Sequence, residues 1–232
     1  MSVKTVGLIG GITWASTLEY YRSINRETAR RLGGVHSARI AMLSLEFHEV
    51  RERTLAGDED GVYAIFLDAA AKLKAAGADF LVLCANTAHK RADRLQQDSG
   101  LPLVHIGDAT GAAIRQAGLA KVGLLGTRPT MEETFMRSKL ETGYGLDVQV
   151  PAKALRDELN GFIYGEMAGG VFSDTARALV ERATAELVAQ GAQGIIHGCT
   201  ELPILMRGRP APCPAFDTTE LHAAAAVDFA LS

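Results

Sequence analysis

The sequence predicts an α/β protein built from two pseudo-symmetric, doubly wound units, each with a parallel sheet, and a ligand site in the cleft between them. Three observations predict this fold. Short apolar runs rich in β-branched residues alternate with longer segments of helical period. These runs are apolar on both faces, as in parallel sheets covered by helices on each side. The pattern of the first half also recurs in the second.

Eight apolar runs have the length and composition of buried strands. They are Val3 to Ile9, Ile40 to Leu45, Phe80 to Leu83, Leu103 to Ile106, Val122 to Leu125, Leu146 to Val150, Gly194 to His197 and Pro214 to Phe216. Four of them precede residue 110 and four follow it, which indicates two units of similar design.

The segments between the runs carry apolar residues at spacings of three and four. Residues that share a helical face are Leu18, Tyr21 and Ile24, then Ile65, Ala69 and Leu73, and later the stripe from Ala176 to Val188. Ser173 stands where the N-cap of the last of these helices belongs. Helices are therefore expected between successive strands.

Two internal sequence similarities indicate that the chain is duplicated. Gly7 lies in a Val-Gly-Leu-Ile-Gly run that resembles the run around Gly123, 116 residues later, and Gly77 matches Gly191, 114 residues later. We assign residues 1–108 plus 212–232 to a first domain and 109–211 to a second. The alternative is one larger sheet with a chance similarity. Ligands of open α/β sheets bind beyond the carboxyl ends of the strands, so two such units would enclose one ligand.

Composition excludes several classes of protein. The net charge of −3 gives no electrostatic footprint for nucleic acid or an anionic membrane, and no apolar run is long enough to span a bilayer. The first eleven residues run into a strand pattern, unlike a signal peptide. Three cysteines do not suggest a disulfide framework, and no Cys/His spacing matches a metal site. We therefore expect a cytoplasmic protein that binds no metal.

Two polar turns follow strands at equivalent places in the repeat. The first reads Cys-Ala-Asn-Thr-Ala-His from Cys84 to His89, and the second reads His-Gly-Cys-Thr-Glu from His197 to Glu201. Backbone N–H groups at such strand-to-helix turns are free to bind a carboxylate. A cysteine there is expected to have a lowered pKa and to act as a thiolate base or nucleophile, so Cys199 is the candidate. Cys213, between two prolines, is interpreted as structural.

Five motifs in order resemble the aspartate/glutamate racemase superfamily over essentially the whole chain. They are Gly7 to Trp14, Ala85 to His89, Gly126 to Met131, Gly198 to Pro203 and Phe216 to His222. The resemblance implies a pseudo-symmetric two-domain fold and racemisation of an amino acid without pyridoxal phosphate. In such enzymes one cysteine from each half flanks the substrate α-carbon. One thiolate removes the α-proton, and the opposite thiol returns a proton to the other face.

The first of these two cysteines is missing here. The repeat aligns Ala85, not Cys84, with Cys199, and the resemblance likewise places the first cysteine immediately before the Asn-Thr pair, where Ala85 stands. Successive strand side chains point to opposite faces, so Cys84 is expected to point away from the substrate unless a bulge rotates it inward.

Three functions remain open. In the first, the chain is a racemase that uses Cys199 and, weakly, Cys84 or a water. Alternatively, it is a one-cysteine decarboxylase or isomerase of a small dicarboxylate, similar to the arylmalonate decarboxylases. The third function is a catalytically weak protein that binds small acids. Each would bind a small amino acid or dicarboxylate.

Substrate contacts are expected from polar residues at the strand ends. Beside Ala85 these are Asn86, Thr87, Thr127, Thr130, Thr200 and Glu201. Aspartate racemases that resemble this chain carry an Arg near the position of Thr54 and a Lys near that of Ala168, and these cations bind the side-chain carboxylate of the substrate. Their absence here weakens the support for a substrate with an acidic side chain. His89, His105 and His197 are candidates for proton transfer, although His197, inside a strand, is expected to be buried and hydrogen-bonded.

No cofactor is expected. Gly7 to Gly11 lacks the dinucleotide-binding spacing, and no Walker sequence occurs. The oligomeric state is left open by the sequence, with a homodimer the commonest assembly of soluble enzymes.

Overall fold

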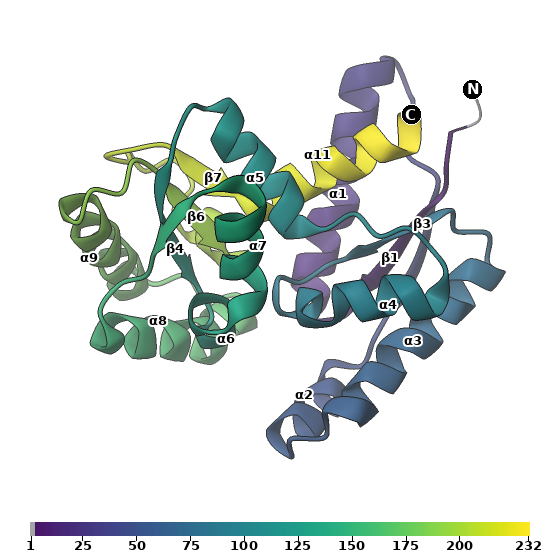
Figure 1. Ribbon diagram of the computed structural model, residues 1–232, viewed down its shortest axis with the longest axis horizontal. Coiled ribbons are helices and arrows are strands. Elements are labelled where there is room, and N and C mark those ends of the chain that lie inside the picture. The colour runs from purple at the N-terminus through teal and green to yellow at the C-terminus, as the bar shows by residue number, and fades with distance from the viewer. Residues whose placement is uncertain (1–2) are drawn as a thin grey trace. The chain divides into compact units, whose positions relative to one another are not determined.

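The computed structural model describes residues 3–232 (Figure 1). The chain divides into two compact units, Met1–His105 with His222–Ser232, and Ile106–Leu221. The sequence placed the divisions at 108/109 and 211/212 instead. The second division differs because the last strand of the chain pairs within the second unit, so the segment that contains it belongs there. The chain crosses between the units at His105 and again inside its final helix.

The first unit is built on a parallel sheet of three strands in the order β2-β1-β3. These strands are β1 (Val6–Gly10), β2 (Ile40–Ser44) and β3 (Phe80–Leu83). The unit's helical elements are α1 (Trp14–Leu32), α2 (Phe47–Leu55), α3 (Glu59–Ala75), the 3-10 helix η1 (Thr87–Arg91), α4 (Ala92–Ser99) and most of α11 (Thr218–Leu231). Residues of α3 and α4 pack on one face of the sheet, and residues of α1 and α11 pack on the other.

The expected fourth strand of this unit, Leu103 to Ile106, is wrong. Leu103 forms only an isolated parallel bridge with Leu81, flanked by hydrogen bonds to Pro102 and Val104. The Leu103 N–H is instead bound by the side chain of Gln96 at 2.9 Å. A helix begins at Ile106, so the apolar run ends as the first turn of a helix rather than as a strand. Short apolar runs do not distinguish these two outcomes.

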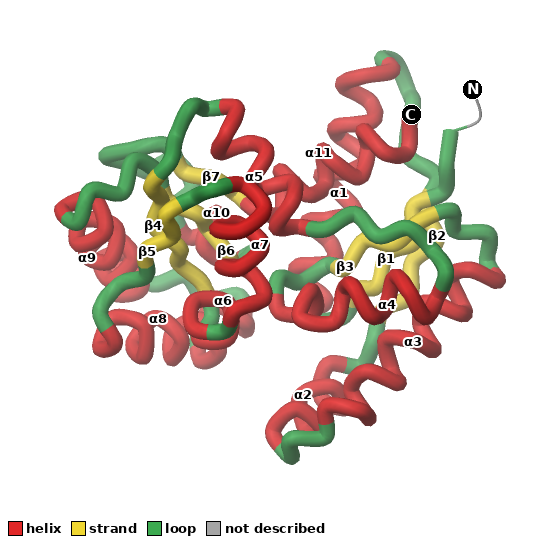
Figure 2. Tube along the Cα trace, in the orientation of Figure 1, coloured by secondary structure: helices red, strands yellow, loops and turns green. Residues whose placement is uncertain are grey.

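The second unit has a parallel sheet of four strands in the order β5-β4-β6-β7 (Figure 2). These are β4 (Lys121–Gly126), β5 (Asp147–Gln149), β6 (Ile195–Gly198) and β7 (Ala215–Asp217). Its helical elements are α5 (Ile106–Gln116), α6 (Arg128–Glu132), α7 (Thr134–Tyr144), α8 (Lys153–Gly165), η2 (Met167–Gly169), α9 (Asp174–Ala189) and α10 (Glu201–Leu205). Core residues of α8 and α9 cover one face, and those of α5 and α7 cover the other.

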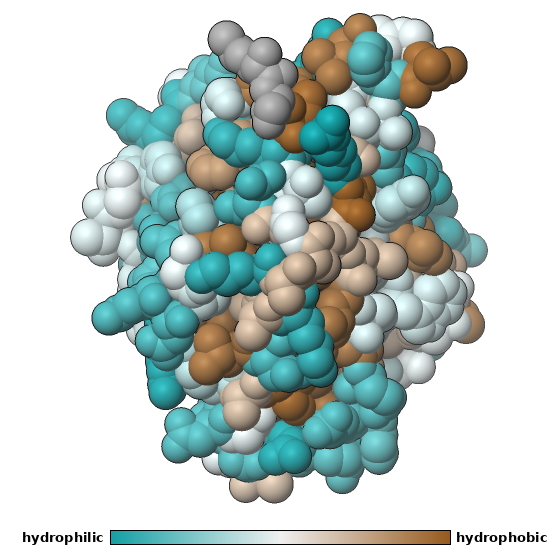
Figure 3. Space-filling model, turned by 90° about the vertical axis from the view of Figure 1, so that its right-hand side faces the viewer, coloured by the Kyte–Doolittle hydropathy of each residue, from teal (hydrophilic) through white to brown (hydrophobic). Residues whose placement is uncertain are grey.

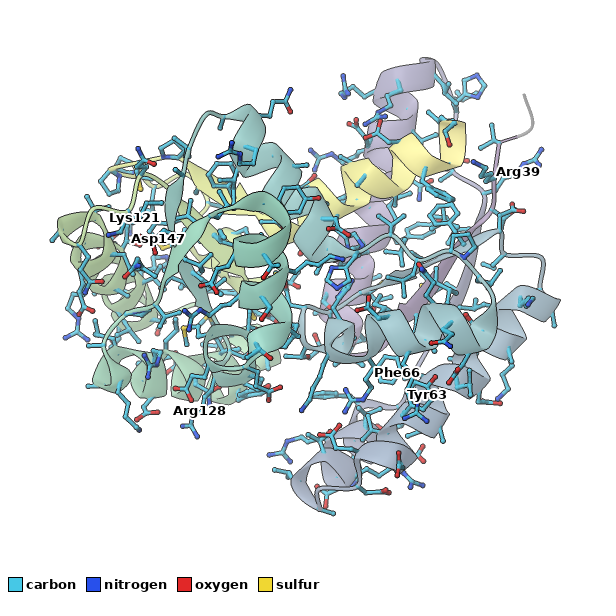
Figure 4. All side chains as sticks on the ribbon, in the orientation of Figure 1. Arg39, Tyr63, Phe66, Lys121, Arg128 and Asp147 are labelled. Carbon is cyan, nitrogen blue, oxygen red and sulfur yellow. The ribbon has the colours of Figure 1, made fainter. Side chains whose placement is uncertain are left out.

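The predicted fold class, α/β with parallel sheets, is confirmed, and several local expectations hold as well. β3 has the predicted bounds. Ser173 is the N-cap of α9, because its hydroxyl accepts the Ala176 N–H at 3.2 Å. At the start of the second sheet, Lys121 and Asp147 form an ion pair of 3.7 Å between β4 and β5 (Figure 4).

The expected apolar face of α1 is only partly buried. Ile24 is fully buried, but Leu18 and Tyr21 are exposed. The helix buries Tyr20 together with small polar residues instead, because their short side chains allow close packing on the sheet. Figure 3 shows one face of the molecule, on which hydrophobic residues lie among hydrophilic ones.

No helix within residues 3–232 is long and apolar enough to cross a membrane.

Candidate active site

Cys199 lies in the turn between β6 and α10 of the second unit. The strand before it is completely buried, since the side chains of Ile195 and Ile196 pack into cores on opposite faces of the sheet. Cys199 follows Ile195 by four residues and packs against the same core, while the residue remains partly accessible to solvent. The buried strand therefore fixes the backbone, and the turn carries a thiol that is accessible in part.

The turn after β4 packs against this turn. Gly126 and Gly198 are paired in the sheet, and a Cβ at Gly198 would lie 2.9 Å from the methyl carbon of Thr130 and 3.0 Å from the Leu125 carbonyl. Glycine is therefore required directly before the thiol. Thr130 is fully buried, and its hydroxyl is 3.0 Å from the hydroxyl of Thr127. Both threonines are thus brought to the same strand ends as Cys199.

The thiol of Cys199 is hydrogen-bonded to a carboxylate. Its Sγ donates to Oε2 of Glu201 at 2.7 Å, and Glu201 is itself buried. Burial and this neighbouring carboxylate raise the pKa of Cys199 well above the usual value for a thiol. Hydrogen bonds from the backbone N–H groups of Thr200 and Glu201 act in the opposite direction but are outweighed.

The expected lowered pKa of Cys199 is therefore wrong for the unliganded turn. The N–H groups of the turn do favour the thiolate, but burial and Glu201, which folds back onto the sulfur from two residues on, outweigh them. Without bound substrate, Cys199 is a thiol that donates its proton to a carboxylate.

A second contact holds the strand that carries this turn. The hydroxyl of Thr218, at the start of α11, donates to the carbonyl of His197 at 2.9 Å. Asp217 accepts the N–H groups of Thr219 at 2.9 Å and Glu220 at 3.3 Å. The Phe-Asp-Thr-Thr-Glu motif thus caps α11 and ties it to β6. The sequence did not assign these residues a role, although Asp and Thr at a strand-to-helix junction are typical of a cap.

The equivalent turn of the first unit has no accessible thiol. Gly7 pairs with Leu81 as Gly123 pairs with Ile195, and Ala85 follows Leu81 by four residues, as Cys199 follows Ile195. The sheet register thus aligns Ala85 with Cys199.

Cys84 has the opposite orientation. Its side chain is 1% exposed and packs with Phe80 and Val82, whereas Ala85 packs against the core that contains Leu81 and Leu83. Complete burial strongly raises the pKa of the Cys84 thiol. No bulge interrupts β3, which pairs with β1 residue by residue.

The residues after Ala85 lead into a cluster of three buried histidines in the first unit. Asn86 is buried, and Thr87 begins η1. The Nδ1 of His89 is 3.0 Å from the carbonyl of Ala85, and its ring lies 4.8 Å from that of His105 and 5.1 Å from that of His222, centroid to centroid. Among residues 3–232, no group of His, Cys, Asp or Glu side chains is arranged to hold a metal ion.

Within this cluster His222 connects three segments. Its Nε2 donates to the Val104 carbonyl at 2.7 Å, and its Nδ1 is 2.8 Å from the hydroxyl of Tyr20. Burial lowers the pKa of His222 to about 4, and burial together with the neighbouring rings lowers the pKa of His89. The rings of His222 and His89 are therefore neutral at pH 7, and both are buried in the first unit.

The two positions at which relatives bind an acidic side chain of the substrate, Thr54 and Ala168, carry no charge in this chain. Thr54 lies near the end of α2, and its hydroxyl donates to the Val50 carbonyl at 2.8 Å. Ala168 lies in η2. Arg128 carries a positive charge and directly follows Thr127 in the sequence. Its guanidinium lies 3.1 Å from the carboxylate of Asp157, and the residue is labelled in Figure 4.

The fold and the two turns define a two-unit parallel α/β protein with a single accessible thiol at the described strand ends after β3 and β6. Comparison with known proteins then identifies the class. The sequence model of the Asp/Glu/Hydantoin racemase family matches residues 9–226. The chain belongs to this family, and the protein is an isomerase of the amino-acid racemase class.

Solved structures and curated relatives agree. A crystal structure described as a putative Asp/Glu racemase from Yersinia pestis is 46% identical, covers 99% of this chain and 100% of its own, and has a TM-score of 0.92. An aspartate racemase homologue from Pyrococcus horikoshii is 33% identical, with 99% and 100% covered and a TM-score of 0.85. The broad specificity amino-acid racemase of Bacillus subtilis is 28% identical over 70% of this chain and 69% of its own length.

Proposed function

We propose that the protein is a cofactor-independent amino-acid racemase in which Cys199 is the acid/base for transfer of the α-proton. The hydrogen bond from Cys199 Sγ to Glu201 Oε2 at 2.7 Å carries this proposal, since it joins a thiol to a proton acceptor at a strand end. The family membership supports the reaction class.

The contacts of the turn suggest how the thiol works. In the direction that protonates the substrate carbanion, the raised pKa keeps a proton on Cys199 ready for donation. In the direction that removes the α-proton, a thiolate is needed, and Glu201 accepts the thiol proton over the 2.7 Å contact. A water returns a proton to the opposite face of the carbanion, because Ala85 carries none. The backbone N–H groups of Thr200 and Glu201 then stabilise the negative sulfur.

The substrate is proposed to be an amino acid of the aspartate or glutamate type, or of a broader set. Its polar groups would be bound by Asn86, Thr87, Thr127 and Thr200, which follow strands β3, β4 and β6. The fully buried Thr130 would contribute by positioning the Thr127 hydroxyl at 3.0 Å. A contribution from Thr54 is also proposed. The uncharged residues Thr54 and Ala168, at positions where the resemblance implies cations, weaken the support for an acidic side chain and so favour the broader set of amino acids.

One observation favours a second candidate, a one-base decarboxylase or isomerase of a small dicarboxylate. Ala85 occupies the position aligned with Cys199, and Cys84 points into the core. A single thiol protonates a carbanion from one face only, which suits loss of CO2 better than racemisation in both directions.

The test is racemisation of single enantiomers of a panel of amino acids, followed by circular dichroism, with CO2 release from small dicarboxylates measured in parallel. The proposal expects loss of chirality that disappears in Cys199→Ala. The matched control is Cys213→Ala, which removes a thiol elsewhere in the same unit and leaves turnover unchanged. CO2 release without racemisation would favour the second candidate, and full activity in Cys199→Ala would exclude both.

Cys199 must remain a free thiol for this chemistry. The reducing cytoplasm maintains that state, so we propose it as the protein's location.

A further inference from the structure

A pocket of about 250 Å³ lies in the second unit at the edge of its sheet, apart from Cys199. We call it the β6–β7 pocket. It is lined by His197 and Ile195 of β6, by Thr184 of α9, and by the segment from Met206 to Ala215 that joins α10 to β7. Cys199 is not among its lining residues, and nothing in the proposed racemase reaction uses it.

Two polar side chains in the wall of this pocket have unused hydrogen-bonding capacity. His197 is 8% exposed and Thr184 is 9% exposed, so both are more than nine-tenths buried. Within residues 3–232, neither the His197 ring nor the Thr184 hydroxyl has a hydrogen-bond partner. The expectation that His197 is buried and hydrogen-bonded is therefore half wrong.

Both side chains line the cavity, and their free hydrogen-bonding capacity can be used by a bound molecule. Most polar side chains that are buried to this extent in folded proteins have hydrogen-bond partners. Here both face one cavity, so a single molecule can satisfy both. A neutral imidazole offers one donor and one acceptor, and the hydroxyl offers both as well.

The rest of the wall restricts the chemistry of the occupant. Pro203, Pro210, Pro212 and Met206 present flat or polarisable apolar surfaces, which pack well against aromatic rings. A negative charge on the occupant is opposed by the carboxylates of Glu181 and Asp217, which also line the pocket.

Arg209 also lines the pocket, but its guanidinium does not offset the two carboxylates. Arg209 is 3.8 Å from the carboxylate of Asp174, so part of its charge is already matched. The size is also limiting, since an apolar cavity of roughly 150 Å³ accommodates benzene. A cavity of about 250 Å³ therefore suits a single ring with one substituent.

We propose that the β6–β7 pocket binds a small uncharged aromatic molecule with one hydroxyl or N–H group, held by hydrogen bonds to His197 and Thr184. The bound group would lie beside the strand that ends at Gly198, directly before Cys199. The pocket is thus a ligand site distinct from the thiol turn.

Phenol is the probe for the test. Protein labelled with carbon-13 on the histidine rings is titrated with phenol and followed by NMR, with the His197 signal assigned from its absence in His197→Phe. We expect a saturable shift of the His197 signal. Benzoate, which has the same ring but a negative charge, is expected to bind at least about tenfold more weakly, because Glu181 and Asp217 oppose it.

Two variants of α9 give a matched comparison. Thr184→Val keeps the shape of the side chain and removes its hydroxyl, so phenol affinity should fall about five- to tenfold, the usual worth of one hydrogen bond. Thr175→Val makes the same change at an exposed position of the same helix and should leave affinity unchanged. Binding should also persist in Cys199→Ala, which separates this site from the proposed active site.

Three results would overturn the proposal. They are no shift of the His197 signal at saturating phenol, equal affinity in wild type and Thr184→Val, and benzoate binding as tight as phenol binding. Because Thr184→Val is isosteric, the proposal can be rejected even where His197→Phe fails to fold.

Discussion

The turns after β3 and β6 occupy equivalent places in the two units but differ in the placement of their cysteines. After β6, a partly accessible sulfur donates to a buried carboxylate at 2.7 Å. After β3, the aligned position is Ala85, and the neighbouring sulfur of Cys84 is 1% exposed within the apolar core. The position of a cysteine relative to the strand register, rather than its presence near a turn, therefore decides whether it can do chemistry.

Replacing each sulfur by oxygen should separate these two roles. Cys199→Ser should lower kcat about 10²- to 10⁴-fold, since a hydroxyl is a far weaker acid than a thiol. Its unfolding free energy should change little. Cys84→Ser should show the reverse, with kcat kept within about twofold and stability lowered by about 1–3 kcal/mol, because a hydroxyl is buried among apolar side chains. Racemisation rates and urea unfolding measure both effects, and loss of kcat in Cys84→Ser would contradict the comparison.

Glu201→Gln tests whether Glu201 accepts the proton of the Cys199 thiol. The amide cannot take the thiol proton, so racemisation should fall about 10- to 100-fold. Because the carboxylate raises the pKa of Cys199, its removal should lower that pKa and speed alkylation of the thiol at neutral pH. Alkylation is measured with iodoacetamide in a Cys213→Ser background. A purely structural role for Glu201 would leave the pH dependence of alkylation where it is in the parent protein.

Ala85→Cys tests the first turn directly. It places a thiol where the family resemblance implies one, on the strand face opposite to that of Cys84. We expect racemisation of both enantiomers to rise about tenfold. The double variant Ala85→Cys, Cys84→Ala should keep this gain. An unchanged rate in both variants would show that the turn after β3 does not supply the second base.

Buried histidines should make the protein less stable in acid. The pKa values of His197 and His222 are lowered to about 4 by burial, whereas the unfolded chain has histidines that titrate near 6.5. Between these values the unfolded state binds more protons, so the unfolding free energy falls as pH drops from about 6.5 to 4. Each ring contributes up to about 3 kcal/mol.

Urea unfolding at pH 7, 5.5 and 4.5 measures this loss. His222→Gln should flatten the profile, while the same change at the exposed His36 should leave its slope unaltered. Equal slopes in the wild type and His222→Gln would contradict the assignment.

Much of the fold could be predicted because periodicity and register are local properties of a sequence. Phe80 to Leu83 was placed correctly, and the period of two along that strand sufficed to put Cys84 and Ala85 on opposite faces. Leu103 to Ile106 was misassigned because Pro102 and the Gln96 side chain, rather than apolarity, determine its backbone partners.

The chemistry of the site was less accessible from the sequence. The pKa of Cys199 depends on a contact with Glu201 two residues away, and no periodicity encodes the rotamers that make it. The clustering of His89, His105 and His222 depends on the return of α11 to the first unit. Such features follow from tertiary packing.

The most direct test of the central role of Cys199 is exchange of the substrate α-proton in D2O, followed by proton NMR for each pure enantiomer. With one working thiol, one enantiomer should exchange at least about tenfold faster than it inverts, and Cys199→Ala should exchange neither. Exchange that continues undiminished in Cys199→Ala would contradict the account.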